Sequence, residues 1–104
     1  MFTTEFLADL RRYMRDKIAY AQYAAGETIM TADVESASIL DDGRICVDFI
    51  IDTSIGAGKT ISEIRLYDAQ DILLAAKAET IACDSNLSSL YYRFYFTVEE
   101  VLSV

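Results

Sequence analysis

The stretch ISEIRLYDAQDILLAA, residues 61–76, decides the fold, because it alternates between apolar and polar residues around a short turn. One face of its first half is aliphatic and the other is polar or aromatic. The first set is Ile64 and Leu66, and the second set is Glu63, Arg65 and Tyr67. A period of two is typical of a strand with one buried face. DAQD at 68–71 favours a turn, and the apolar residues after it return as a second strand. The stretch predicts an antiparallel β-hairpin.

The same period extends in both directions from this hairpin. DDG at 41–43 is a hairpin signal, and the alternating run RICVDFIID follows it at 44–52, so residues 29–52 predict another hairpin. The clearest strand begins at Leu90. We expect one alternating set to be buried and the other to be partly exposed. The buried set is Leu90, Tyr92, Phe94, Phe96 and Val98, and the exposed set is Tyr91, Arg93, Tyr95 and Thr97.

The N-terminal part has a helical period instead. Its apolar residues recur every three or four positions, at Phe6, Leu10, Tyr13, Met14, Ile18 and Ala21. Thr3 or Thr4 provides an N-cap, and Gly26 suits a helix C-terminus. This pattern predicts one helix over 4–25.

Together these patterns predict a single α+β domain over 1–104. We expect the helix at 4–25 and a β region at 28–99. The β region is expected to contain about five antiparallel strands that form a small curled sheet or a sandwich.

Composition excludes several classes of function. The net charge is −8, which disfavours nucleic acid and anionic membrane surfaces as partners. The chain has no histidine, so it contains neither a Ser-His-Asp nor a Cys-His site. We expect no catalytic, cofactor-binding or metal-binding residues and no enzymatic activity. No signal peptide is recognisable, so we expect a reducing bacterial cytoplasm, with Cys46 and Cys83 as buried free thiols.

Gly58-Lys59-Thr60 is the end of a phosphate-binding loop motif, but the rest of that motif is missing. The first glycine of the motif would stand at position 53, which is Thr. A helix should follow Thr60, whereas the residues after it alternate as a strand does. We therefore expect no nucleotide site there.

Two groups of residues form a candidate interaction surface. The helix carries Arg11, Arg12 and Arg15, which suit an acidic neighbour, including a second copy of the chain. The last strand carries Tyr91, Arg93 and Tyr95, an aromatic and cationic strip. The simpler interpretation is that the arginines are a solvated helix face and that the strip covers the sheet or lies beneath the helix.

The hairpin at 61–75 resembles a recurrent segment of phage tail-fibre and tail-collar proteins. In that family a strand of the form [VI]-x-E-[IV]-G-L-[FY]-D leads into a turn and returns as G-x-L-[LI]-A. The matching residues are Ile61, Glu63, Ile64, Leu66, Tyr67, Asp68, Leu73, Leu74 and Ala75. Arg65 and Asp71 replace the two glycines of the pattern.

The resemblance implies a structural or assembly protein of a phage or prophage tail, as a fibre, collar or baseplate component. Its partners would be further copies of itself, other tail proteins, or both, and it would pass from the host cytoplasm into a virion. An alternative from the residues alone is a small bacterial β-rich module that binds a ligand or peptide through Tyr91, Arg93 and Tyr95. An enzyme is the third hypothesis, and nothing in the sequence assigns it a reaction.

Overall fold

The chain begins with the helix α1, which spans Thr4–Lys17 in a computed structural model of the protein. The structure describes residues 1–53, 59–83 and 89–98. Thr3 caps the helix, because its side-chain oxygen accepts a hydrogen bond from the Phe6 backbone N–H at 3.1 Å. The predicted start of the helix is therefore confirmed.

The helix ends at Lys17, so the prediction of one helix over 4–25 is wrong in its last third. Residues Tyr20–Ala25 form the strand β1 instead. Alanine and the apolar spacing favour a helix here, but β1 pairs with a strand on each side, and this tertiary pairing overrides a weak local preference. Gly26 has φ +63° and lies in the turn after β1, where it supports a tight reversal and does not cap a helix.

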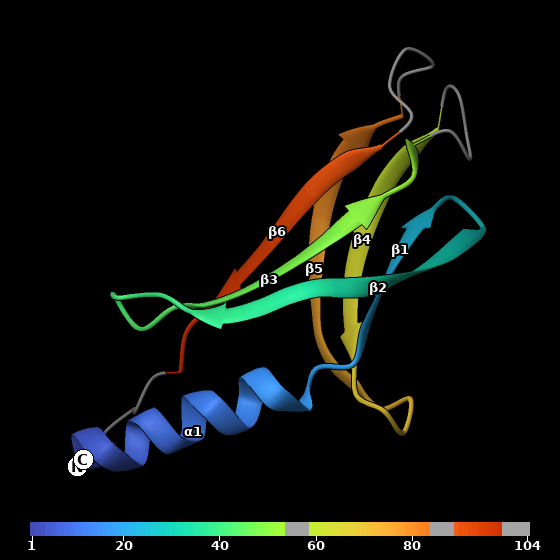
Figure 1. Cartoon of the computed structure of the whole chain (residues 1–104). Coiled ribbons are helices and arrows are strands. Elements are labelled where there is room, and N and C mark those ends of the chain that lie inside the picture. Colours follow the sequence, from blue (N-terminus) through green and yellow to red (C-terminus); the bar gives the residue numbers. More distant parts are fainter. Residues whose placement is uncertain (54–58, 84–88, 99–104) are drawn as a thin grey trace.

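Six antiparallel strands follow α1 within the described residues, in the sheet order β5-β4-β1-β2-β3-β6. They are β1 Tyr20–Ala25, β2 Thr28–Ile39, β3 Ile45–Ile51, β4 Thr60–Tyr67, β5 Leu73–Ala82 and β6 Leu90–Phe96. The predicted α+β class and curled sheet are confirmed, and β1 adds one strand to the five expected within 28–99. Figure 1 shows that the sheet curls into a half-barrel.

The core lies inside the curl and is built from one alternating set of residues on each strand. In β3 this set is Ile45, Val47, Phe49 and Ile51, all of them fully buried. Tyr23 of β1 joins the core and accepts a hydrogen bond from the Asp52 backbone N–H at 2.9 Å. The predicted inward set of β6 is confirmed at Tyr92 and Phe94, which are buried.

Asp68 organises the turn between β4 and β5. Its Oδ1 accepts hydrogen bonds from the backbone N–H groups of Gln70 and Ile72, both at 2.9 Å. Asp71 has φ +63°, a backbone conformation that glycine adopts freely and that Asp tolerates better than most residues. Asp71 therefore supports the tight reversal between β4 and β5.

The two edge strands of the half-barrel, β5 and β6, meet through side chains. The Tyr92 hydroxyl donates a hydrogen bond to Glu79 Oε2 at 2.5 Å, and Lys77 Nζ lies 5.9 Å from the centre of the Phe94 ring. The contacts of Tyr92 with Glu79 and of Phe94 with Lys77 hold the two edge strands near each other. Charged side chains that point inward from an edge strand also discourage pairing with another chain.

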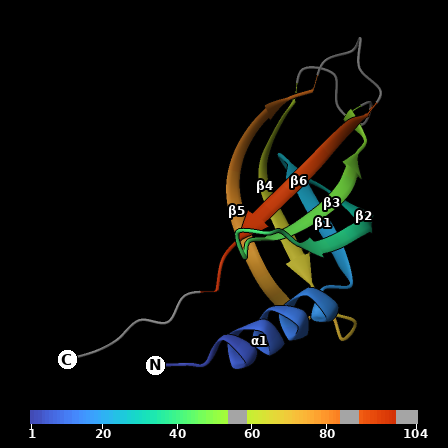
Figure 2. The same cartoon turned by 60° about the vertical axis from the view of Figure 1, so that its left-hand side comes forward.

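The helix α1 crosses the lower end of the half-barrel in both views (Figures 1 and 2). It packs against β2 and β3, yet none of its residues is buried. Phe6, Tyr13 and Met14 remain exposed. The apolar stripe of the helix is therefore only partly covered by its own sheet.

Candidate interaction surface

The outer face of the half-barrel carries the predicted strip of β6. The register pairs Tyr91 with Ile50 and Arg93 with Asp48, so the outward residues of β3 and β6 lie side by side. Tyr91 is 53% exposed and Tyr95 is 39% exposed. The prediction that this set is partly exposed is confirmed.

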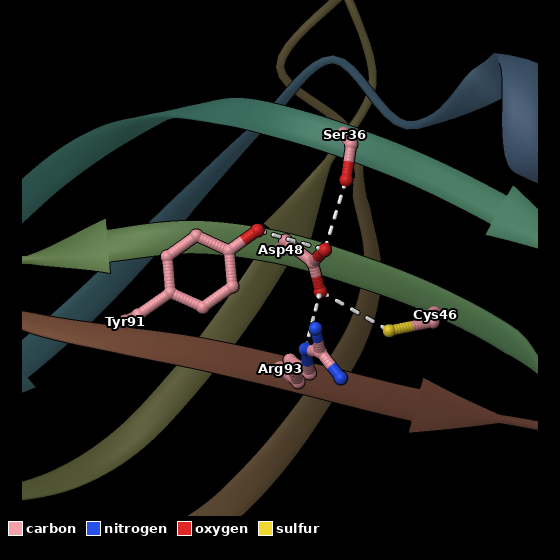
Figure 3. Close-up of polar contacts among 5 residues, drawn as sticks. All are labelled: Ser36, Cys46, Asp48, Tyr91 and Arg93. Atoms are coloured by element: carbon pink, nitrogen blue, oxygen red, sulfur yellow. Dashed lines mark hydrogen bonds and ion pairs between the residues drawn. The ribbon is translucent and has the colours of Figure 1, made fainter.

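A nearly buried carboxylate, Asp48, lies beneath the strip (Figure 3). Its Oδ2 accepts hydrogen bonds from Ser36 Oγ and from the Tyr91 hydroxyl, each at 2.9 Å. Its Oδ1 accepts a bond from Cys46 Sγ at 3.1 Å and lies 3.6 Å from Arg93 Nε. One carboxylate thus connects β2, β3 and β6.

The hydrogen-bond donors around Asp48 determine which form of Asp48 and of Cys46 is present at neutral pH. Burial raises the pKa of the Asp48 carboxyl, but hydrogen bonds from Cys46, Ser36 and Tyr91 outweigh burial and hold that pKa below its ordinary value. Burial and the bond to Asp48 raise the pKa of the Cys46 thiol. Asp48 is therefore an anion at neutral pH, and Cys46 stays a thiol, which is the unreactive form.

A second arginine extends the strip. The Arg44 guanidinium carbon lies 4.8 Å from the centre of the Tyr95 ring, and that of Arg93 lies 5.8 Å from the centre of the Tyr91 ring. Asp42 holds Arg44 through an ion pair at 2.7 Å. We call Arg44, Tyr91, Arg93 and Tyr95 the outer tyrosine–arginine row.

The helix arginines of the candidate surface do not belong to this row. Arg12 pairs with Asp9, and Arg15 pairs with Asp16 at 2.9 Å, so both are engaged with neighbours on α1. Arg11 lies against Gly43, where an added Cβ would approach its guanidinium to 3.1 Å. Gly43 has φ +87° and lies in the turn between β2 and β3, which also carries Arg44.

Arg44, Cys46 and Asp48 were missed by the sequence reasoning. Alternation along residues 44–52 puts Cys46 and Asp48 on the face opposite Ile45, Val47 and Phe49, so their outward direction follows from the sequence. The sequence did not indicate that β6 is the neighbour of β3, since the two strands are separated by about forty residues along the chain. The pairing of β3 with β6, which no local pattern encodes, brings Asp48 under Arg93.

Other site types were also considered. Three or more His, Cys, Asp or Glu side chains do not gather as a metal site anywhere in residues 1–53, 59–83 and 89–98. Both cysteines are free and buried, as predicted. Residues 54–58 of the glycine-rich segment lie outside the described residues, and Thr60 begins β4, where a phosphate-binding loop requires a helix.

The fold and this surface define an α+β protein with an open antiparallel half-barrel and a polar cluster on its outer face. Comparison of the chain with protein-family models, curated proteins and solved structures found no match. In the part of the chain that the structure describes, no helix is long and apolar enough to cross a membrane.

Proposed function

We propose that this chain is a non-enzymatic assembly protein that acts through protein–protein contacts made by the outer tyrosine–arginine row. The observation that carries the proposal is that exposed Tyr91 and Arg93 are both held by the buried Asp48. Tyr and Arg are the residue types that most often dominate binding energy at protein interfaces. Side chains already held in place lose less conformational entropy when a partner binds.

The shape of this face supports a macromolecular partner. The core lies inside the curl, so the row lies on the convex side of the sheet. Small ligands favour concave pockets, whereas protein partners bind flat or convex surfaces as well. The row therefore fits a second copy of the chain or another protein better than a metabolite.

The hairpin at 61–75 supports a place for this role in a phage or prophage tail, as a fibre, collar or baseplate component. Its family-like pattern departs at Asp71, which has φ +63°. Because that conformation is the one a turn glycine provides, the departure is compatible with the same hairpin. The partners would be copies of the chain, other tail proteins, or both, in a bacterial cytoplasm and then in a virion.

Site-specific photo-crosslinking in the native host tests the proposal. A photoreactive phenylalanine analogue replaces Tyr91 in one variant and the exposed Thr31 of β2 in a control variant. Capture of a second copy or of a tail protein from position 91, and not from position 31, is the expected result. Equal capture from both positions, or capture from neither, would overturn the role of the row.

A peptide-binding module is the second candidate, and the partial exposure of Tyr91 and Tyr95 favours it, because complete burial would exclude it. This alternative predicts that a short acidic peptide binds the isolated chain and that Arg93→Ala weakens the binding. The assembly role predicts instead that only a folded partner binds. Titration of the peptide by NMR, followed at the ring signals of Tyr91 and Tyr95, separates the two candidates.

A further inference from the structure

A separate feature of the fold is an apolar pocket of about 420 Å³ between α1 and the lower end of the sheet. Tyr13 and Met14 of α1 line one side. Leu66 and Leu74 of the β4–β5 hairpin line the other side, together with Phe96 of β6. This volume falls within the range of roughly 300–1,000 Å³ that is usual for small-ligand sites.

A second, polar pocket adjoins the first. It has a volume of about 340 Å³ and shares Tyr13 and Lys17 with the apolar pocket. Asp68, Ala69 and Gln70 of the β4–β5 turn line the other side. Asp16 of α1 also lines this pocket, and its charge is balanced by an ion pair with Arg15 at 2.9 Å. We call the two pockets together the double pocket. Its shape, apolar at one end and polar at the other, suits an amphiphilic molecule.

The polar end contains a buried carboxylate oxygen that has an ion-pair partner but no hydrogen-bond partner among the described residues. Asp68 is 1% exposed, and its Oδ1 is occupied by two backbone N–H groups. Its Oδ2 is buried and has no hydrogen-bond partner among the described residues. Lys17 Nζ lies 3.4 Å from Oδ2 and forms an ion pair with it, but the two groups are not oriented for a hydrogen bond. A buried polar atom of this kind costs free energy until a donor reaches it.

A hydroxyl group is the head group that satisfies both partners. It donates its proton to Asp68 Oδ2 and accepts a hydrogen bond from the Lys17 ammonium with its oxygen. An ammonium head group would be repelled by Lys17, and a carboxylate head group would be repelled by Asp68. Charge therefore selects a neutral head group that both donates and accepts.

We infer that the double pocket binds a neutral single-chain alcohol, with the aliphatic chain between α1 and the sheet and the hydroxyl between Asp68 and Lys17. The double pocket is distinct from the outer tyrosine–arginine row. This inference therefore does not depend on the assembly role, and each can fail without the other.

Three probes of equal chain length test the inference below their aggregation concentrations: 1-decanol, decylamine and decanoate. The readout is the NMR signal of the methionine methyl groups in the intact protein. Met14 lines the pocket, whereas Met30 lies in β2 near the opposite end of β1 and serves as an internal control. We expect 1-decanol to shift the Met14 signal and to bind about tenfold more tightly than either charged probe, because only it makes both hydrogen bonds.

Two variants should change which of the three probes binds most tightly. Lys17→Met leaves an unopposed carboxylate and should shift the preference to decylamine. Asp68→Asn keeps the Oδ1 acceptor of the turn but replaces Oδ2 with a donor, so it should shift the preference to decanoate. A Met14 signal that responds to no probe would overturn the inference. So would the same order of affinities in all three proteins, or equal shifts of Met14 and Met30.

Discussion

At the scale of single residues, Asp48 has the largest set of polar contacts on the outer face. It holds donors from three strands, Ser36 of β2, Cys46 of β3 and Tyr91 of β6. Burial of a charge is costly unless hydrogen bonds replace the lost water, and here they do. Asp48 therefore serves two purposes: it links the strands, and it holds the exposed Tyr91 and Arg93 in place.

Asp48→Asn should lower the free energy of unfolding by roughly 1–3 kcal/mol at neutral pH, because the donors that now share a carboxylate lose a charged acceptor. Urea denaturation measures the change. Asp33→Asn on the exposed face of β2 is the matched control, and it should stay within about 0.5 kcal/mol of the wild type. Equal stability of Asp48→Asn and the wild type would contradict this account of the cluster.

The same pair of proteins has an expected pH dependence. The folded state holds the pKa of Asp48 below its ordinary value, so the stabilisation is present above about pH 4 and is lost as pH falls through the lower, folded pKa. The difference in unfolding free energy between the wild type and Asp48→Asn should be constant from neutral pH down to about pH 5. It should narrow below about pH 4.

At the scale of elements, β1 shows how tertiary pairing selects between two local structures. Gln22 lies in β1 between Thr31 of β2 and Arg65 of β4. A helix over this segment would leave β2 and β4 without their shared neighbour, so the backbone N–H and C=O groups of these two strands would lose their partners. The ladder on both edges of β1 outweighs the helical preference of its alanines, since propensity differs by only about 1 kcal/mol per residue.

Substitution by threonine distinguishes the two local structures, because threonine favours strands and disfavours helices. Gln22→Thr should leave the free energy of unfolding unchanged or raise it by up to about 1 kcal/mol. Ala8→Thr, in the true helix α1, should lower it by about 0.6 kcal/mol. Urea denaturation of both variants provides the comparison, and a loss of similar size at both positions would argue against the strand.

At the scale of the whole molecule, the half-barrel is closed by side chains and not by a backbone ladder. Among the described residues, β5 and β6 are the edges of the sheet, and they meet through Glu79, Lys77, Tyr92 and Phe94. Proximity to Tyr92, whose hydroxyl donates to it, lowers the pKa of Glu79, so its carboxylate stays ionised and ready to accept. The curl of the sheet therefore depends on a few contacts across the opening.

Tyr92→Phe should loosen this closure while leaving the ring in the core. The loss of one hydrogen bond to a charged acceptor should lower the unfolding free energy by about 1.5 kcal/mol. Hydrogen exchange should become faster in β5 and β6, while β1 at the centre of the sheet keeps its protection. Tyr13→Phe, at an exposed position of α1, is the control. Unchanged exchange in β5 and β6 would show that other contacts hold the edges together.

Most of the fold was predictable from the sequence, because period and turn chemistry are local. The alternation of Ile64 and Leu66, the turn at Asp68 and Gly43, and the N-cap at Thr3 all match the structure. The candidate surface was only half predictable. Tyr91, Arg93 and Tyr95 follow from the alternation of one strand, whereas their partners Asp48 and Arg44 follow from strand order.

The sequence by itself determined the class of the fold, the β2–β3 and β4–β5 hairpins and which face of β6 is buried, since each depends on neighbours within a few residues. Only the tertiary structure decided that Tyr20–Ala25 is a strand, that β6 lies beside β3, and that Lys17 reaches Asp68. The physical reason is the same in all three cases. Local preference differs by only about 1 kcal/mol per residue and does not encode which distant segments meet, so the pairing of strands across the whole sheet decides these contacts.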